Sequence, residues 1–282
     1  MSERPLPTTV AQALAQARQG GVDRLDAQLM LCTLLQRPRA WLLAHDEDAL
    51  PADLAERYAS WAHRRAQGEP LAYLLGDKEF YGLNLGVGPD VLIPRPDTET
   101  LVEWALELIP AGPLSSPFEV LDLGTGSGAI ALALQHHRPQ ARVTAVDASP
   151  GALAVAQANA QRLKLPVENL PGSWFEPVAG RHFDLVVSNP PYIAEDDEHM
   201  AALRFEPKQA LTSGATGLDD LCLITAEASR HLKPGGWLLL EHGYNQAEAV
   251  SDLLKNRGFR HVGTRTDLGK NPRCTGGQKP HE

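Results

Sequence analysis

The sequence predicts an α/β protein in which a small helical bundle precedes a doubly wound, mostly parallel sheet. Three observations support this fold class. From about residue 114 onward, short apolar runs alternate with stretches of helical spacing. A glycine-rich turn joins the first apolar run to the helix that follows it. The segment from residue 8 to 67, in contrast, carries only apolar stripes with a helical period.

The N-terminal segment is expected to form a helical domain of its own, over residues 1–75. In the stretch VDRLDAQLMLCTLLQ, Asp23 is a candidate N-cap, and leucines recur near three- and four-residue intervals. Similar stripes surround Trp41 and run from Asp53 to Arg65. Together these stripes predict a small bundle of amphipathic helices.

Glycines and prolines punctuate the next segment, GDKEFYGLNLGVGPD, and separate short β-prone runs. This pattern predicts a β-hairpin or extended linker over residues 76–90. The second domain is then expected to occupy residues 91–282.

The strands of the second domain are expected to be covered on both faces, because their apolar runs are continuous rather than alternating. They lie at 118–124, 141–147, 183–189 and 236–243. Stretches with the length of crossover helices lie at 129–137, 150–163, 218–232 and 246–257. In such Rossmann-like sheets, ligands bind beyond the carboxyl ends of the strands.

Composition narrows the classes of function. The formal net charge of −9 provides no basic field for nonspecific binding of nucleic acid. Neither the three cysteines nor the ten histidines show the spacing of metal ligands, so no metal site is expected. No apolar run is long enough to cross a bilayer, and residues 1–10 lack the features of a signal peptide, which favours a cytoplasmic location.

A glycine loop and a carboxylate indicate a nucleotide-like ligand. The loop DLGTGSG follows the first strand and opens a helix, and Asp147 ends the second strand, where it can accept hydrogen bonds from ribose hydroxyls. This pattern fits both a nicotinamide cofactor and S-adenosylmethionine, while a tight turn without a ligand is the plain structural alternative. Asp122, just before the loop, could orient its amides, approach the ligand or merely end the strand.

The stretch VSNPPYI ends an apolar strand abruptly and suggests a site for a planar amine. The Asn189 carboxamide oxygen and the Pro190 carbonyl are two acceptors on a rigid chain, which suits the two protons of an –NH₂ group. Tyr192 could pack on the planar group that carries this amine. The alternative is that NPPY is only a rigid turn.

DLGTGSG, Asp147 and NPPY together resemble class I S-adenosylmethionine-dependent methyltransferases that modify amino or amide nitrogens. The segments GEPLAYLLGDKEFYGL, LIPRPDTE, RFEP, LLLEHGYNQ and NPRCTGG extend the likeness over nearly the whole chain, to the release factor glutamine methyltransferases of the HemK/PrmC family. That family methylates the glutamine side-chain amide in the Gly-Gly-Gln loop of bacterial class I peptide chain release factors.

The resemblance assigns roles to residues of this chain. S-adenosyl-L-methionine, whose product is S-adenosyl-L-homocysteine, would be held by Gly124, Thr125, Gly126, Ser127, Gly128, Asp147, Trp174 and Asn189. The substrate amide would lie against Asn189, Pro190, Pro191 and Tyr192, and the expected catalytic groups are Asn189, Pro190 and Tyr192. The helical domain would recognise the release factor. Ser173 departs from the acid that the family commonly has before its aromatic residue.

Several residues keep two interpretations. Arg95, Asp97, Thr98 and Glu99 form a substrate-facing turn, or Thr98 or Asp97 caps the next helix. Glu206 contacts a partner or braces its loop, and His242 is expected to be a hydrogen-bonded structural residue. The tail also contains Gly276-Gly277-Gln278, which copies the substrate tripeptide, by chance or for automethylation.

Three rival functions remain at this stage. A ribosomal-protein glutamine methyltransferase would share the glycine loop and NPPY. An adenine-N6 nucleic-acid methyltransferase would use NPPY in the same way, although the acidic charge balance opposes it. A binding module without activity would need neither the loop nor Asn189.

Overall fold

The computed structural model describes residues 5–112 and 116–281, and the chain divides into two compact units after Asp77. Residues 1–4, which belong to the N-terminal segment that lacks the features of a signal peptide, lie outside the described ranges. In the part of the chain that the structure describes, no helix combines the length and the apolar character needed to span a bilayer.

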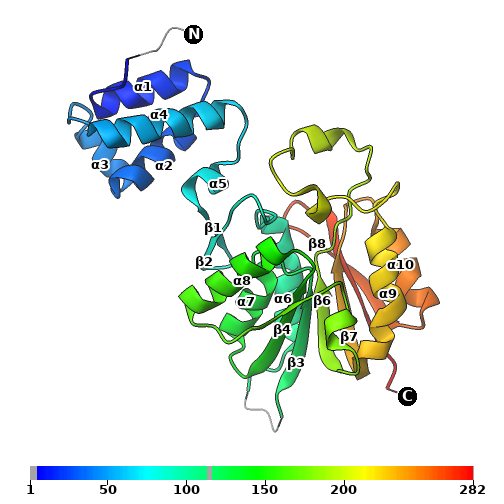
Figure 1. Ribbon diagram of the computed structural model, residues 1–282. Coiled ribbons are helices and arrows are strands. Elements are labelled where there is room, and N and C mark those ends of the chain that lie inside the picture. The colour runs from blue at the N-terminus through cyan, green and yellow to red at the C-terminus, as the bar shows by residue number, and fades with distance from the viewer. Residues whose placement is uncertain (1–4, 113–115, 282) are drawn as a thin grey trace. The chain divides into compact units, whose positions relative to one another are not determined.

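The first unit is a helical bundle, as the stripes predicted (Figure 1). Its helices are α1 (Val10–Gln19), α2 (Arg24–Leu35), α3 (Arg39–Ala44), α4 (Ala52–Ala66) and α5 (Leu71–Leu75). Asp23 caps α2, since its carboxylate accepts a hydrogen bond of 2.7 Å from the Leu25 amide. The apolar stripes meet in one core that includes Met30, Leu31 and Tyr58.

A short hairpin begins the second unit. Strands β1 (Asp77–Phe80) and β2 (Leu83–Gly86) are joined at Tyr81 and Gly82, which both have positive φ angles. Two consecutive residues in this region match the twist of a two-residue hairpin turn. Phe80 and Leu85 turn their side chains into the core of the second unit.

The second unit is built on a seven-stranded sheet with the order β5-β4-β3-β6-β7-β9-β8. The strands are β3 (Phe118–Leu123), β4 (Ala141–Asp147), β5 (Glu168–Pro171), β6 (Phe183–Ser188), β7 (Leu232–Glu241), β8 (Arg260–Thr266) and β9 (Pro272–Gln278). The first five in this order are parallel, whereas β9 runs antiparallel to both β7 and β8. The predicted doubly wound, mostly parallel sheet is confirmed.

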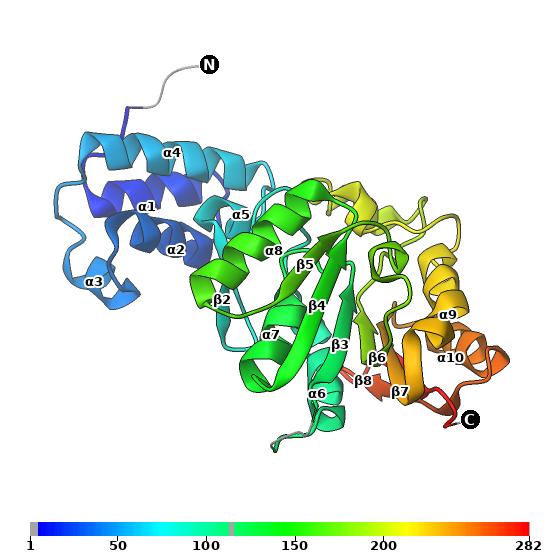
Figure 2. The same ribbon diagram turned by 60° about the horizontal axis from the view of Figure 1, so that its bottom comes forward.

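Helices cover both faces of this sheet, as Figures 1 and 2 show. They are α6 (Glu99–Leu108), α7 (Ala129–His137), α8 (Pro150–Leu163), α9 (Asp219–His231) and α10 (Ala247–Asn256). Successive strand residues point to opposite faces: Val120 packs in the core with α6 and α7, and Leu121 packs in the core with α9 and α10. Short 3₁₀ turns lie at Pro96–Thr98, Glu176–Val178, Glu198–Ala201 and Lys208–Ala210.

The tail tripeptide is part of the sheet. Gly276 lies in β9 so close to β7 that an added Cβ would come within 2.4 Å of Leu239 Cδ2. The Gln278 side-chain amide donates a 2.8 Å hydrogen bond to the Gly235 carbonyl. Gln278 also pairs with Trp237, four positions before the carboxyl end of β7. The glycines therefore serve close packing, and this placement gives the automethylation hypothesis no support.

Candidate active site

A cavity of about 270 Å³ opens beyond the carboxyl ends of β3, β4 and β6. This is the edge at which doubly wound sheets bind their ligands. Among the residues predicted from the sequence, those that line it are Gly124, Thr125, Gly126, Ser127, Asp147, Trp174, Asn189 and Pro191. Three predicted residues, Gly128, Pro190 and Tyr192, are not part of the lining.

The glycine loop is fixed to the neighbouring strand. The amides of Gly124 and Thr125 both donate to the Val146 carbonyl of β4, at 2.9 and 3.0 Å. Gly124 and Gly126 have φ angles of 69° and 56°, which residues that carry a side chain rarely adopt. A Cβ on Gly126 would have no atom within 4 Å. The loop thus presents bare backbone to the cavity.

Gly128 has a different role from the glycines before it. It begins α7 with a φ of 84°, and an added Cβ would lie 2.9 Å from Leu132 Cδ1 and 3.4 Å from the Ala156 methyl. Gly128 therefore permits close packing of α7 and α8, and its predicted contact with the cofactor stays a prediction.

Asp122 orients the loop from below. Its Oδ2 accepts hydrogen bonds from the Thr125 hydroxyl, at 2.7 Å, and from the Ala131 amide, at 3.2 Å. Oδ1 is buried and has no hydrogen-bond partner among the described residues. Burial raises the pKa of this carboxyl to about 7, although its two hydrogen bonds oppose the shift. Asp122 thus holds the loop through the Thr125 side chain and the start of α7 through a backbone amide, and no loop amide donates to it among the described residues.

Asp147 links the loop to the helix that follows β4. Oδ2 accepts from the Gly126 amide and Oδ1 from the Ser149 amide, both at 2.8 Å. Each carboxylate oxygen has a second lone pair, and the residue lines the cavity. Asp147 is thus held rigidly and still has acceptors available for hydroxyl groups.

Trp174 and Ser173 form another part of the cavity wall. Trp174 has a φ of 45°, and a Cβ on Gly124 would lie 3.5 Å from its indole ring. The Ser173 amide donates to Glu176 Oε2 at 3.3 Å, which stabilises the turn. A flat indole beside a bare glycine backbone is suited to a planar aromatic ligand group.

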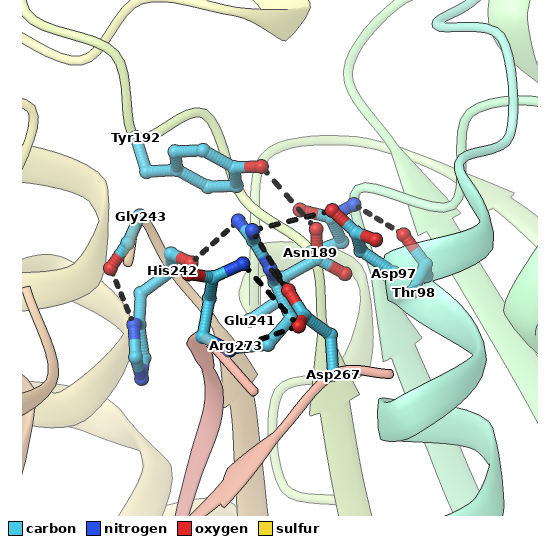
Figure 3. A network of polar contacts seen from close by, with 10 residues as sticks. Asp97, Thr98, Asn189, Tyr192, Glu241, His242, Gly243, Asp267 and Arg273 are labelled. Atoms are coloured by element: carbon cyan, nitrogen blue, oxygen red, sulfur yellow. Dashed lines mark hydrogen bonds and ion pairs between the residues drawn. The ribbon is translucent and has the colours of Figure 1, made fainter. Parts of the chain in front are cut away.

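Asn189 follows β6 and is held by one hydrogen bond. Its Nδ2 donates to the Thr98 hydroxyl oxygen at 3.3 Å, while no described residue donates to its Oδ1 (Figure 3). The residue is half-buried and lines the cavity, so its carboxamide is not sealed into the interior. Pro190 next to it is buried.

Tyr192 is not among the residues that line the cavity. Its hydroxyl donates to Glu241 Oε1 at 3.3 Å, and its ring packs against the core beneath α9 and α10. Burial, followed by the charge of Glu241, raises the pKa of its phenol. These contacts hold the NPPY turn, and the packing of Tyr192 against a planar substrate group stays a prediction.

The RPDTE segment closes one side of the cavity through Arg95 and Thr98. Arg95 forms an ion pair with Glu206, and Glu206 Oε2 also accepts from the Ile93 amide at 3.1 Å. Glu206 thus braces this loop. Neither side chain offered as a helix cap makes a capping hydrogen bond, because Thr98 faces Asn189 and Asp97 pairs with Arg273 at 3.2 Å.

His242 is a structural residue, as expected. It is fully buried, with Nδ1 against the Gly243 carbonyl at 2.8 Å and Nε2 against the Thr275 hydroxyl at 2.7 Å. Burial lowers the pKa of its imidazole. Over residues 5–112 and 116–281, no cluster of three metal-ligating side chains is present.

Glu241 and Arg273 do not line the cavity, but they contact Tyr192 and Asp97, which neighbour lining residues, and they were not predicted as site residues from the sequence. Glu241 is 1% exposed at the end of β7, and burial raises the pKa of its carboxyl to about 7. Arg273 of β9 contacts Asp267 at 3.1 Å as well as Asp97 (Figure 3). The acid that ends the apolar run LLLE is the feature of the sequence from which Glu241 could have been predicted.

Comparison with known proteins places both units in context. Residues 8–76 match the PrmC N-terminal domain, and residues 108–216 match the methyltransferase small domain. The release factor glutamine methyltransferase of Bordetella pertussis is 50% identical over 260 residues, which are 91% of this chain and 95% of that protein. The protein of the same name from Pseudomonas aeruginosa is 50% identical over 258 residues, or 90% and 92% of the two chains.

Solved structures support the fold. A methyltransferase from Pyrococcus furiosus aligns with a TM-score of 0.54 at 19% identity, covering 80% of this chain and 99% of that one. At this identity the likeness concerns the fold alone.

Proposed function

Because the chain belongs to the release factor glutamine methyltransferase family, we propose that it methylates the glutamine side-chain amide nitrogen in the Gly-Gly-Gln motif of a peptide chain release factor. The observation that carries this proposal is the 50% identity over nine-tenths of the chain, which spans both units. A cytoplasmic location follows from this substrate, since release factors act in translation.

The residues around the cavity fit S-adenosyl-L-methionine as the methyl donor. Gly126 exposes backbone where a side chain would otherwise fill the space, and Asp147 offers carboxylate lone pairs at the end of β4. The Trp174 ring and Ser173 would contact the adenine, and Gly124, Thr125 and Ser127 would surround the rest of the molecule. When bound, the donor supplies an electrophilic methyl group on a positively charged sulfur.

Asn189 and Pro190 would hold the substrate amide. Asn189 Oδ1 has no donor among the described residues, and the same is true of the Pro190 carbonyl. Two such acceptors can orient the two protons of a glutamine –NH₂ group and aim its nitrogen at the methyl donor. Accepting both N–H bonds also stabilises the positive charge that grows on this nitrogen during transfer, so no strong base is needed.

The helical unit is the proposed docking surface for the release factor. Residues 8–76 match a domain named for this family, and the cavity of the second unit accounts for the chemistry without them. Stable binding of nucleic acid or membrane forms no part of this proposal.

The substrate is tested by offering the alternatives side by side. The protein is incubated with methyl-labelled S-adenosylmethionine and purified release factor, ribosomal proteins or nucleic acid, and label is measured in each. We expect label in the release factor, at the glutamine of its Gly-Gly-Gln motif. Label confined to ribosomal protein or nucleic acid would overturn the substrate assignment, and binding of the release factor without transfer would overturn the activity.

A further inference from the structure

The middle of the NPPY turn has no backbone donor, because Pro190 and Pro191 carry no N–H group. The start of the turn is fixed by the sheet, since Ser188 pairs with β7. The other end lies beyond β6, and Figure 3 shows that the side chains of Asn189 and Tyr192 both make polar contacts there. The contacts of Tyr192 therefore decide where the rigid Pro-Pro segment stands.

The side-chain amide of Gln246, directly before α10, holds this end of the turn. Its Nε2 donates to the Tyr192 carbonyl at 3.0 Å and to the carbonyls of Thr216 and Gly217, both at 3.4 Å. Its Oε1 accepts from the Gly243 amide at 2.8 Å. Gln246 is 9% exposed, so these hydrogen bonds are made away from solvent. One buried amide thus joins the NPPY turn to two other loops.

The loop that carries Gly217 encloses the same carbonyl. A Cβ on Gly217 would lie 2.2 Å from the Tyr192 carbonyl oxygen and 2.9 Å from Gln246 Nε2. The next residue of the turn is held by the same loop, since the Ile193 amide donates to the Leu211 carbonyl at 2.9 Å. The Tyr192 carbonyl therefore has one defined place, between a bare glycine and a side-chain amide.

We infer that Gln246 is a positioning residue that fixes the Tyr192 carbonyl and, through the rigid Pro-Pro segment, the two acceptors that meet the substrate amide. These acceptors are Asn189 Oδ1 and the Pro190 carbonyl. The inference rests on the proposed function, in which their placement aims the substrate nitrogen. Gln246 has a firm base, because Val250 of α10 is fully buried in the core. A misplacement of about 1 Å near a reacting group can lower a rate by about 10²-fold.

Gln246→Glu tests this role with little change of size. The variant keeps an acceptor for the Gly243 amide, but an oxygen that repels the Tyr192 carbonyl replaces the Nε2 donor. We expect kcat on the release factor to fall by about 10- to 100-fold, while Kd for S-adenosylmethionine changes by less than about threefold. A wild-type kcat in the folded variant, or a loss of donor affinity as large as the loss of kcat, would refute the positioning role.

Gln135→Glu is the matched control. Gln135 is 1% exposed, and its Nε2 donates to the carbonyls of Pro139 and Ala141, both at 3.4 Å, outside the cavity lining. Both variants lose the same kind of buried hydrogen bond, so both should be less stable in urea, but only Gln246→Glu should lose kcat. A parallel fall of kcat in Gln135→Glu would assign the effect to lowered stability and overturn the inference.

Gly217→Ala approaches the Tyr192 carbonyl from its other side. The added methyl group would displace this carbonyl, so kcat should fall as in Gln246→Glu, again with donor affinity retained. Gly180→Ala is the matched control, because Gly180 has a similar φ of 77° but a Cβ added to it would have no atom within 4 Å. Its kcat should stay unchanged. A normal kcat in folded Gly217→Ala would show that transfer does not depend on where this carbonyl lies.

Hydrogen exchange separates this inference from the proposed substrate, because it needs no release factor. Exchange of the Ile193 amide, relative to that of the β3 amides, should become faster in Gln246→Glu and stay unchanged in Gln135→Glu. Faster exchange in a protein that fails to methylate release factor would refute the proposed function and support the hold of Gln246 on the turn. Unchanged exchange of Ile193 in folded Gln246→Glu would refute that hold whatever the substrate proves to be.

Discussion

The carboxylate of Asp147 accepts a 2.8 Å hydrogen bond from the amide of Gly126, which joins the end of β4 to the glycine loop that follows β3. Because Oδ1 also accepts from the Ser149 amide, the side chain has little rotational freedom. One acid thus shapes the loop and at the same time presents acceptors to the cavity. This double role makes it the residue on which we expect donor binding to depend most.

Asp147→Ala should therefore weaken binding of S-adenosylmethionine. The variant loses a charged acceptor and releases the Gly126 amide, so we expect Kd, measured by isothermal titration calorimetry, to rise by about 10- to 100-fold. Asp184→Asn is a matched control, since Asp184 is also a strand acid but pairs with Lys233 away from the cavity. An unchanged Kd in Asp147→Ala would remove Asp147 from the proposed donor site.

Asn189→Ala should separate binding of the donor from transfer. The substitution removes an acceptor that matters chiefly when positive charge grows on the substrate nitrogen. We expect kcat to fall by a factor on the order of 10²–10³, with Kd for S-adenosylmethionine within a few-fold of the wild-type value. Single-turnover measurements with saturating donor report the transfer step directly, and a normal rate there would defeat the proposed grip on the amide.

The glycine loop and Asn189 were predictable because their signals are local. Each follows an apolar run that marks a strand, and in a parallel sheet the carboxyl ends of strands meet at one edge. The hydrogen bonds that Thr98 and Glu241 make have no such local signal. Thr98 is 91 residues from Asn189 in sequence, and Glu241 is 49 residues from Tyr192, so only the folded chain shows that they share hydrogen bonds.

Strands β8 and β9 were missed for a related reason. The stretch PRCTGGQ contains a proline and two glycines, residues that are depleted in strands, and RHVGTRT is mostly polar. Tertiary packing overrides these preferences, because β9 needs small residues where it passes Leu239 and Trp104. The same packing explains why glycines occupy positions 276 and 277, where the sequence alone left open whether the Gly-Gly-Gln tripeptide has a role of its own.

Gly276→Ala should destabilise the second unit. The new methyl group would lie 2.4 Å from Leu239 Cδ2 and 3.0 Å from both the Leu238 carbonyl oxygen and the Trp104 ring. Overpacking of this kind costs about 1–3 kcal/mol of unfolding free energy, measured by urea denaturation. Gly263→Ala is the matched control. Gly263 pairs with Gly276 in the sheet, but a Cβ added to it would have no atom within 4 Å. Equal stability of the two variants would contradict the packing role.

The stability of the sheet should fall as the pH rises toward 7. Burial raises the pKa of both Asp122 and Glu241 to about 7 in the folded protein, from 3.8 and 4.5. Between about pH 4.5 and 7, the folded state therefore binds protons that the unfolded state has released, and unfolding free energy decreases with increasing pH. Above about pH 7, both states are ionised and these two groups add no further slope.

Native-state hydrogen exchange of β3 and β7 amides, at several pH values and corrected for intrinsic exchange, measures this slope in the sheet itself. Asp122→Asn removes one titrating group. The unfolding free energy of this variant should therefore change less steeply with pH than that of the wild type between about pH 5 and 7, by at most the contribution of one bound proton. Thr225→Val, which removes a buried hydroxyl that does not titrate in this range, should keep the wild-type slope. A slope in Asp122→Asn equal to that of the wild type would show that Asp122 is already ionised well below neutral pH in the folded protein.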